Sequence, residues 1–207
     1  MQGNLADGFH LEIRFMKTPL DTEKQAFRIT AKKVRVQANK QSPKAGNIIA
    51  DKIIRLTDIP AKSIISGFWP LADEIDTRPL LEALHKAGHQ ILLPVMQGAN
   101  QPLVFACWAP GDKLVTGNFK TQEPAPEQTK MIPQIMICPL LAFDRQGFRM
   151  GYGGGFYDRS IAQIQATQPL TTIGIAFAAQ EVESVITGPY DQPLDKIITE
   201  KEMIAIT

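Results

Sequence analysis

The sequence predicts an α/β fold, a single three-layer α/β/α domain built on a mainly parallel sheet. Short apolar runs alternate with helix-like stretches along most of the chain, which is typical of helices packed on both faces of a parallel sheet. The strand-like runs are residues 62–69, 90–95, 102–108, 134–138 and 171–177. The chain has 207 residues, 44% of them hydrophobic, which suits one domain with a substantial core.

Four helices are expected between these strands. Their approximate bounds are 23–39, 43–59, 76–87 and 157–166, with Asp21 and Thr22 as candidate caps of the first and Gly88 after the third. Residues 1–20 show little periodicity and are expected to form an irregular N-terminal extension, which leaves 21–207 as the domain. Residues 109–130 are expected to be a long connection without regular structure, and such connections are often functional.

Composition and charge exclude several classes of protein. The net charge is +1, from 22 basic and 21 acidic residues, and a nucleic-acid-binding surface is usually more basic. No apolar stretch is long enough to span a membrane, and the first residues lack the apolar core of a signal peptide. Cys107 and Cys138 lie in apolar runs, so we expect buried, reduced thiols. These observations predict a cytoplasmic protein without a nucleic-acid or membrane partner.

The segment CPLLAFDRQGFRMGYGGGFYDRS, residues 138–160, is the strongest candidate for a functional loop. Four glycines occur at 151, 153, 154 and 155, directly before an expected helix. Glycine amides at a helix start form an anion-binding concavity. Arg145 and Arg149 add positive charge, and Asp158 is a suitable ligand for phosphate-bound Mg²⁺. The glycine spacing fits neither the Walker loop nor the dinucleotide fingerprint, so a phosphate site and a tight structural turn remain equal alternatives here.

Basic residues also mark the first expected helix. Lys24 and Arg28 are four residues apart and therefore share one face, and Lys32 and Arg35 lie close to the same stripe. These side chains either reach toward phosphates or form a solvated basic face. The spacing does not distinguish the two.

The segment FDRQGFRMGYGGGFYDR resembles the glycine-rich motif of the 5-formyltetrahydrofolate cyclo-ligase family, also called methenyltetrahydrofolate synthetases. Met150 stands in place of a leucine and Phe156 in place of a tyrosine. Further similar segments follow the family order, among them KQAFR, WPLADEIDT, GNFKTQEP, IGIAF and DKIITE. One segment departs from the family pattern: VITGPYD, residues 185–191, replaces the usual Leu-Pro-x-Glu-x-His-Asp and retains only its Asp191.

The resemblance implies a fold like that of NagB, RpiA and the CoA transferases. It also implies a reaction in which 5-formyltetrahydrofolate and ATP, with Mg²⁺, give 5,10-methenyltetrahydrofolate, ADP and phosphate. The formyl oxygen is phosphorylated, N10 attacks the same carbon, and phosphate leaves. Alignment and charge neutralisation are the main protein contributions to such phosphoryl transfer. The substrate is expected to be a folate, polyglutamylated or not, and the protein a monomer.

The resemblance also implies roles for individual residues. Trp69 and Glu74 are expected to contact the folate, together with Phe156 and Tyr157. Asp158 and Asp191 are the expected Mg²⁺ ligands. Catalytic roles are expected for Tyr157 and for Arg145, the latter from its charge and location. The residues expected to bind ATP are Lys24, Arg28, Arg149, Met150, Gly151, Tyr152, Gly153, Gly154, Gly155, Phe156 and Tyr157.

Alternatives stay open at several positions. Trp69 is also explained as a core aromatic at a strand end, and Glu74 as a surface charge or part of a helix cap. Two other functions fit the same residues: a related ATP-dependent enzyme acting on another small amide or carboxylate, and a non-catalytic folate- or nucleotide-binding protein.

Overall fold

The computed structural model describes residues 18–56, 58–71, 73–117 and 120–206 of the chain. Most of the expected N-terminal extension, residues 1–17, lies outside the described residues. The predicted domain boundary at residue 20 falls within a helix, because α1 begins at Pro19.

A seven-stranded sheet runs through the centre of the described structure, in the order β11-β10-β9-β6-β1-β2-β3. Neighbours among β10, β9, β6, β1 and β2 are parallel, whereas β3 and β11 pair antiparallel at the two edges. The prediction of a mainly parallel sheet is therefore confirmed. The bounds are β1 (Ile64–Ser66), β2 (Gln90–Met96), β3 (Leu103–Trp108), β6 (Ile135–Pro139), β9 (Thr171–Ile175), β10 (Lys196–Ile198) and β11 (Met203–Ala205).

The expected helices are all present. They are α1 (Pro19–Gln41), α2 (Ala45–Leu56), α3 (Arg78–Lys86) and α4 (Phe156–Gln165). The predicted cap of the first helix was wrong. Thr18 is the N-cap, since its hydroxyl accepts a hydrogen bond from the Asp21 amide at 3.2 Å, and the Asp21 carboxylate accepts one from the Thr18 amide at 3.1 Å. This reciprocal capping box starts α1 one turn earlier than the sequence suggested.

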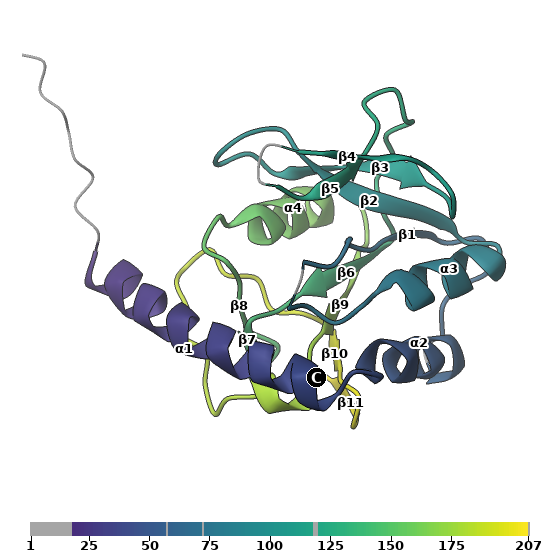
Figure 1. The fold of residues 1–207 in the computed structure, drawn as a ribbon. Coiled ribbons are helices and arrows are strands. Elements are labelled where there is room, and N and C mark those ends of the chain that lie inside the picture. Colours follow the sequence, from purple (N-terminus) through teal and green to yellow (C-terminus); the bar gives the residue numbers. More distant parts are fainter. Residues whose placement is uncertain (1–17, 57, 72, 118–119, 207) are drawn as a thin grey trace, which may run out of the picture.

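Side chains from alternate positions of each strand pack on opposite faces of the sheet. On β6, Ile135 and Ile137 belong to the core that includes α2 and α3, whereas Met136 and Cys138 belong to the core that includes α4. This period of two produces three layers. Figure 1 shows α2 and α3 on one side of the sheet and α4 on the other.

The long connection at 109–130 has regular structure, so the expectation of an unstructured excursion was wrong. It contains an antiparallel hairpin of β4 (Leu114–Thr116) and β5 (Gln122–Pro124). Buried Glu123 fixes the hairpin to the end of β2, because its carboxylate accepts hydrogen bonds from the Thr121 hydroxyl at 2.8 Å and the Met96 amide at 3.3 Å. The polar contacts of Glu123, together with the packing of Leu114 against the core, hold these short strands.

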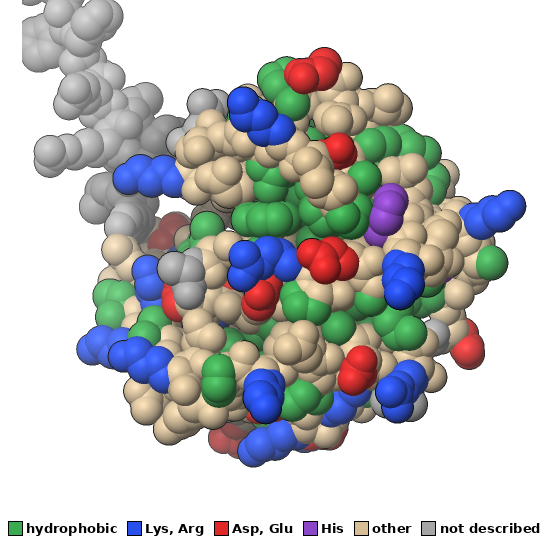
Figure 2. Space-filling model, turned by 45° about the vertical axis from the view of Figure 1, so that its right-hand side comes forward, with side chains coloured by type: hydrophobic (Ala, Val, Ile, Leu, Met, Phe, Trp, Pro, Cys, Tyr) green, Lys and Arg blue, Asp and Glu red, His purple; other side chains and the backbone are tan. Residues whose placement is uncertain are grey.

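The surface carries charge of both signs. Figure 2 shows a face on which basic and acidic side chains lie interspersed around an apolar area, in keeping with the net charge of +1. Of the helices in the described part of the chain, none has both the length and the apolar composition required to cross a membrane.

Candidate active site

The loops that follow β1 and β6 leave the sheet at the point where the chain connections switch from one face of the sheet to the other. Strand β1 continues through α3 to β2 on one side, and the neighbouring parallel strand β6 continues through α4 to β9 on the other. Because α3 and α4 cover opposite faces, the carboxyl ends of β1 and β6 diverge at a topological switch point. Ligands of open α/β sheets bind in the crevice at such a point.

The loop after β6 is the glycine-rich segment. The chain passes through a two-stranded ribbon, β7 (Ala142–Phe143) and β8 (Arg149–Met150), before the glycine loop, which we define as residues 151–155. Gly153 and Gly155 have φ values of 96° and 64°. Both values lie in the left-handed region that glycine enters without steric cost. Any residue other than glycine would therefore be strained at these two positions of the loop.

Helix α4 begins directly at the end of this loop. Gly155 is its N-cap and supplies no side-chain acceptor. Among the described residues, the backbone N–H groups of Gly153 and Gly154 have no hydrogen-bond acceptor either. These two unpaired amides, which lie directly before a ten-residue helix, favour an anionic ligand.

A cavity of about 560 Å³ opens between the glycine loop and α1. All of the residues predicted to bind ATP line it. Five further lining residues were not predicted from the sequence: Asp21, Leu71, Met96, Thr121 and Pro139. Leu71 and Pro139 follow or end neighbouring strands, so the strand-end rule could have indicated them. Thr121 lies in the connection that was expected to lack structure, within the segment GNFKTQEP that resembles the family, and that resemblance was the signal available for it.

Two cations from α1 reach the cavity. The Arg28 Nε donates a hydrogen bond of 3.0 Å to the Gly151 carbonyl, and Lys24 forms an ion pair with Asp191. Both predicted ATP-binding residues of α1 therefore lie beside the glycine loop. The interpretation of α1 as an entirely solvated basic face does not apply to this pair.

The two acids predicted to bind Mg²⁺ both line the cavity, and each is paired with a cation. Asp158 accepts hydrogen bonds from Arg149 Nη2 at 2.8 Å and from the Gln192 amide at 3.1 Å. The Asp191 carboxylate also accepts one from the Gly188 amide at 2.7 Å. The segment that departs from the family pattern thus still brings its retained acid to the cavity.

The described residues contain no group of three or more His, Cys, Asp or Glu side chains that could hold a metal ion. This arrangement fits an ion that arrives with its ligand. Mg²⁺ commonly takes only one or two carboxylates and completes its shell with phosphate oxygens and water.

Phe156 and Tyr157 line the cavity from the first turn of α4 and pack against the core on that face of the sheet. Burial raises the pKa of Tyr157 well above its ordinary value, and the neighbouring Cys138 and Glu74 act in the same direction. The Tyr157 hydroxyl therefore keeps its proton at neutral pH and serves as a donor, not as a base.

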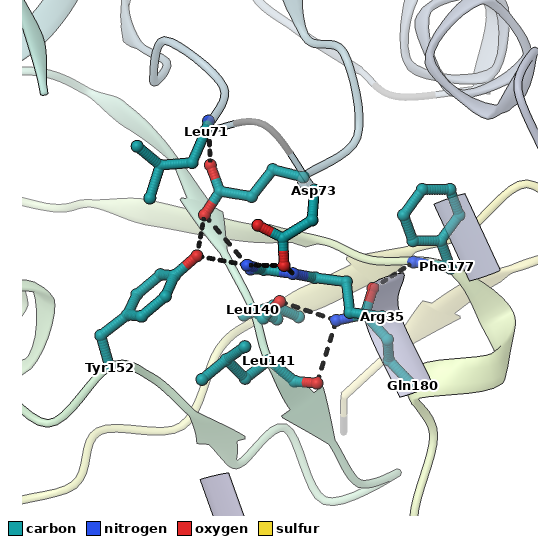
Figure 3. Close-up of polar contacts among 9 residues, drawn as sticks. Arg35, Leu71, Asp73, Leu140, Leu141, Tyr152, Phe177 and Gln180 are labelled. Carbon is teal, nitrogen blue, oxygen red and sulfur yellow. Dashed lines mark hydrogen bonds and ion pairs between the residues drawn. The ribbon is translucent and has the colours of Figure 1, made fainter. Parts of the chain in front are cut away.

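The predicted folate contacts Trp69 and Glu74 lie in the loop after β1 and line a second pocket, of about 280 Å³. Leu71 lines both cavities. Glu74 is buried, and the hydroxyl of Tyr152 donates to it at 2.8 Å. Burial raises the pKa of Glu74, although the Leu71 amide and Arg35 act against that rise. Figure 3 shows Tyr152 of the glycine loop pointing toward the loop after β1, which carries Leu71 and Asp73.

Arg145 is the predicted site residue that lines neither of the two cavities. Its guanidinium is exposed and forms ion pairs with Glu181 at 2.6 Å and Glu202 at 2.7 Å. The turn between β7 and β8 carries Arg145 away from the glycine loop, a geometry that proximity in the sequence does not reveal.

The fold and the cavity together define an α/β protein with a ligand site at the switch point of a parallel sheet, walled by a glycine loop and a basic helix. Residues 21–200 match the model of the 5-formyltetrahydrofolate cyclo-ligase family, and the chain belongs to that family.

Individual relatives agree with this assignment. The chain is 32% identical to the 5-formyltetrahydrofolate cyclo-ligase of Escherichia coli K12, over 77% of this chain and 90% of the relative. It is 28% identical to the protein of the same name from Haemophilus influenzae, over 86% and 99%. The solved structure of the 5,10-methenyltetrahydrofolate synthetase of Aquifex aeolicus superposes with a TM-score of 0.73 at 23% identity, covering 88% of this chain and 92% of that one. That likeness supports the fold.

Proposed function

We propose that this chain has the activity for which its relatives are named, and that the cavity at the switch point carries it out. The reaction converts 5-formyltetrahydrofolate and ATP to 5,10-methenyltetrahydrofolate, ADP and phosphate. The observation that carries the proposal is the position of the glycine loop. The amides of Gly153 and Gly154 line one cavity together with Lys24 and Arg28, within the part of the chain that matches the family.

The chemistry explains why such a site suffices. A formamide oxygen leaves poorly, so the γ-phosphoryl group of ATP is first transferred to it. N10 of the folate then attacks the activated carbon, the bond to the phosphorylated oxygen breaks, and phosphate departs. The protein needs to align the formyl oxygen with the phosphorus and to neutralise the charge that develops there. It need not supply a covalent nucleophile.

ATP is placed with its phosphates against the glycine loop. The amides of Gly153 and Gly154 and the N-terminus of α4 face negative charge favourably. Arg28 holds the loop through the Gly151 carbonyl and adds a cation at the same place. We assign no role in phosphate binding to Arg145, because its ion pairs lie outside the cavity.

Mg²⁺ fits the donor set of the same cavity. Asp158 and Asp191 supply hard oxygen ligands, and an ATP-bound ion would neutralise charge on the transferring phosphoryl group. In the structure Asp191 forms an ion pair with Lys24, and Asp158 forms one with Arg149. We therefore infer that both acids exchange a protein cation for the ATP-bound ion when substrate binds.

The folate is placed beside Glu74, Trp69 and Leu71. Glu74 is a buried acceptor that lines the smaller pocket, which suits the N–H groups of a pterin ring, and Leu71 lines both pockets. Tyr157 lines the larger cavity with a protonated hydroxyl, so it can donate a hydrogen bond to the formyl oxygen or to the transferred phosphoryl group.

A direct assay tests the proposal. The purified protein is mixed with 5-formyltetrahydrofolate, ATP and Mg²⁺, and the near-ultraviolet absorbance of the methenyl product is followed together with ADP release. We expect both to rise in equal amounts over many enzyme equivalents. Folded protein at high concentration that forms neither product would overturn the proposal.

The same materials separate the two other functions. Thermal stabilisation by ATP but by no reduced folate would indicate an ATP-dependent enzyme with another substrate. Stabilisation by folate or nucleotide without ADP release would indicate a binding protein. The expectations of a monomer and of a cytoplasmic location stay proposals. Free Cys107 and Cys138 support the latter, because reduced thiols are typical of a reducing compartment.

A further inference from the structure

Arg35 is the most deeply buried charged side chain of α1. Its exposed fraction is 1%, although it lies between the exposed residues Lys33 and Gln37. An arginine is rarely buried to this degree unless its charge is paired. It lines neither cavity, so it cannot touch a ligand placed in them.

The guanidinium of Arg35 joins three other groups. It donates to Asp73 at 2.8 and 3.2 Å and to Glu74 at 3.3 Å. It also donates to the hydroxyl of Tyr152, and it lies 5.2 Å from the centre of that ring. Figure 3 shows the guanidinium between the loop after β1 and the glycine loop. One side chain of α1 therefore contacts both loops of the site.

The contacts fix both oxygens of Glu74. Its Oε1 accepts from Arg35 and from Tyr152, and its Oε2 accepts from the Leu71 amide at 2.8 Å. Tyr152 in turn is a residue of the glycine loop and is 49% exposed. Three partners, from α1, the glycine loop and the loop after β1, therefore hold the Glu74 carboxylate in one orientation.

We propose that Arg35 is a positioning residue, which orients Glu74 toward the folate and ties it through Tyr152 to the loop that binds the nucleotide. This inference rests on the proposed function. The cyclo-ligase reaction needs the formyl oxygen aligned with the γ-phosphorus. The loop that binds the folate and the loop that binds the nucleotide must therefore keep a fixed position relative to each other. The Arg35 network is the direct polar connection that the described residues provide between them.

The charge on Glu74 supplies a readout that a purely structural role would not affect. Burial raises the pKa of Glu74, whereas Arg35 and the hydroxyl of Tyr152 lower it and the neighbouring Asp73 raises it. Tyr157 interacts with Glu74 from α4, and Asp76 and Arg78 line the same pocket. Without Arg35 the pKa of Glu74 rises further. As the pH is lowered, the Glu74 carboxylate is therefore protonated at a higher pH than in the wild type.

The test compares Arg35→Gln, Arg35→Lys and the control Lys33→Gln, which removes an exposed charge from the same helix. For each folded variant, kcat, the KM of each substrate and the pH profile of kcat/KM for the folate are measured. We expect Arg35→Gln to raise the KM for 5-formyltetrahydrofolate tenfold or more and that for ATP threefold or less. The acidic limb of the kcat/KM profile for the folate should move to higher pH in Arg35→Gln. The shift should be smaller in Arg35→Lys and absent in Lys33→Gln.

Two results would overturn the inference. One is a folded Arg35→Gln protein with the wild-type KM values and pH profile. The other is a loss of kcat without any change in KM or in the acidic limb, which marks a structural residue only. Failure of the proposed function is distinct, because the wild-type protein would then form no methenyl product.

A second variant decides the matter if Arg35→Gln does not fold. Tyr152→Phe removes only the hydroxyl that links the two loops. Calorimetry measures 5-formyltetrahydrofolate binding with and without a non-hydrolysable ATP analogue. With the analogue at saturation for each protein, we expect it to tighten folate binding at least fivefold in the wild type and twofold or less in Tyr152→Phe. If the analogue tightens folate binding by the same factor in both proteins, the Tyr152 hydroxyl does not connect the two loops functionally.

Discussion

The guanidinium of Arg28 lies 3.0 Å from the point where a Cβ atom at Gly153 would stand. The same arginine holds the loop through the carbonyl of Gly151. The Arg28 side chain therefore packs so closely against Gly153 that it would have to shift to make room for a Cβ atom at this position. This close approach places positive charge beside the amides that we propose to bind phosphate.

Gly153→Ala is expected to lose stability and ATP affinity together. Its φ of 96° strains any other residue, and the new methyl group displaces Arg28. We expect a loss of about 1–2 kcal/mol in unfolding free energy and a rise of at least tenfold in the KM for ATP. Urea unfolding and steady-state kinetics measure the two effects.

Gly88→Ala is the matched control. Gly88 ends helix α3 with a φ of 89°, but nothing lies within 4 Å of the added methyl group. This variant should lose about 1 kcal/mol through backbone strain alone and keep the wild-type KM for ATP. Equal kinetic losses in both variants would contradict the role of the close approach to Arg28.

Neutralising either paired acid of the cavity should raise the requirement for Mg²⁺. In Asp158→Asn and Asp191→Asn one hard oxygen ligand is weakened, and Arg149 or Lys24 loses its partner. We expect kcat to fall by about 100-fold or more in Asp158→Asn and the Mg²⁺ concentration for half-maximal rate to rise in both. Titration of the rate with Mg²⁺ after EDTA treatment measures these quantities.

Asp51→Asn serves as the control for this pair, since Asp51 is exposed on α2 and lines neither cavity. It should keep the wild-type Mg²⁺ dependence. If Asp191→Asn also keeps that dependence, Asp191 acts only as the partner of Lys24, and the metal role falls to Asp158 alone.

Arg145→Gln tests a sequence-based prediction that the structure does not support. A phosphate ligand would cost a large fraction of kcat when neutralised. The exposed ion pairs with Glu181 and Glu202 lead us to expect a kcat within about twofold of wild type and a stability loss below about 1 kcal/mol. A loss of kcat above about 100-fold would show that the turn moves into the site during catalysis.

The fold could be predicted because apolar periodicity and helix signals agree along most of the chain. The antiparallel hairpin at 114–124 escaped that approach, since it depends on the polar contacts of buried Glu123 with Thr121 and Met96. The capping box of Thr18 was also missed, because a second acceptable cap occurs three residues later. Local sequence patterns do not show which of several possible polar partners a residue will hydrogen-bond in the folded protein.

The candidate site was predicted where residues are neighbours in one loop or one helix turn. Glycines and Lys24 with Arg28 are cases of this kind, and the structure brings them together. Arg35 lies close to a basic stripe for which the sequence leaves two interpretations, a solvated face or contacts with phosphates. Its actual partners Asp73 and Tyr152 are 38 and 117 residues away in the chain. Burial of a charged residue by distant partners leaves no periodic signal in the sequence.

The thiol of Cys138 predicts how stability depends on alkaline pH. Burial on the central strand β6 raises the pKa of this thiol from 9.0 to about 12. The unfolded chain therefore releases the proton near pH 9, while the folded protein retains it up to about pH 12. Between these values the unfolded state binds fewer protons, so stability falls as pH rises, by about 1.4 kcal/mol per pH unit.

Urea unfolding at pH 8, 9 and 10 tests this dependence in wild type, Cys138→Ala and the control Cys107→Ala, whose thiol is less buried. From pH 8 to pH 10 the wild type should lose about 1.4 kcal/mol more than Cys138→Ala. That variant is less stable at pH 8 because it leaves a small cavity. Cys107→Ala should retain most of the wild-type slope. Identical slopes in wild type and Cys138→Ala would mean that the thiol does not sense burial between β6 and α4.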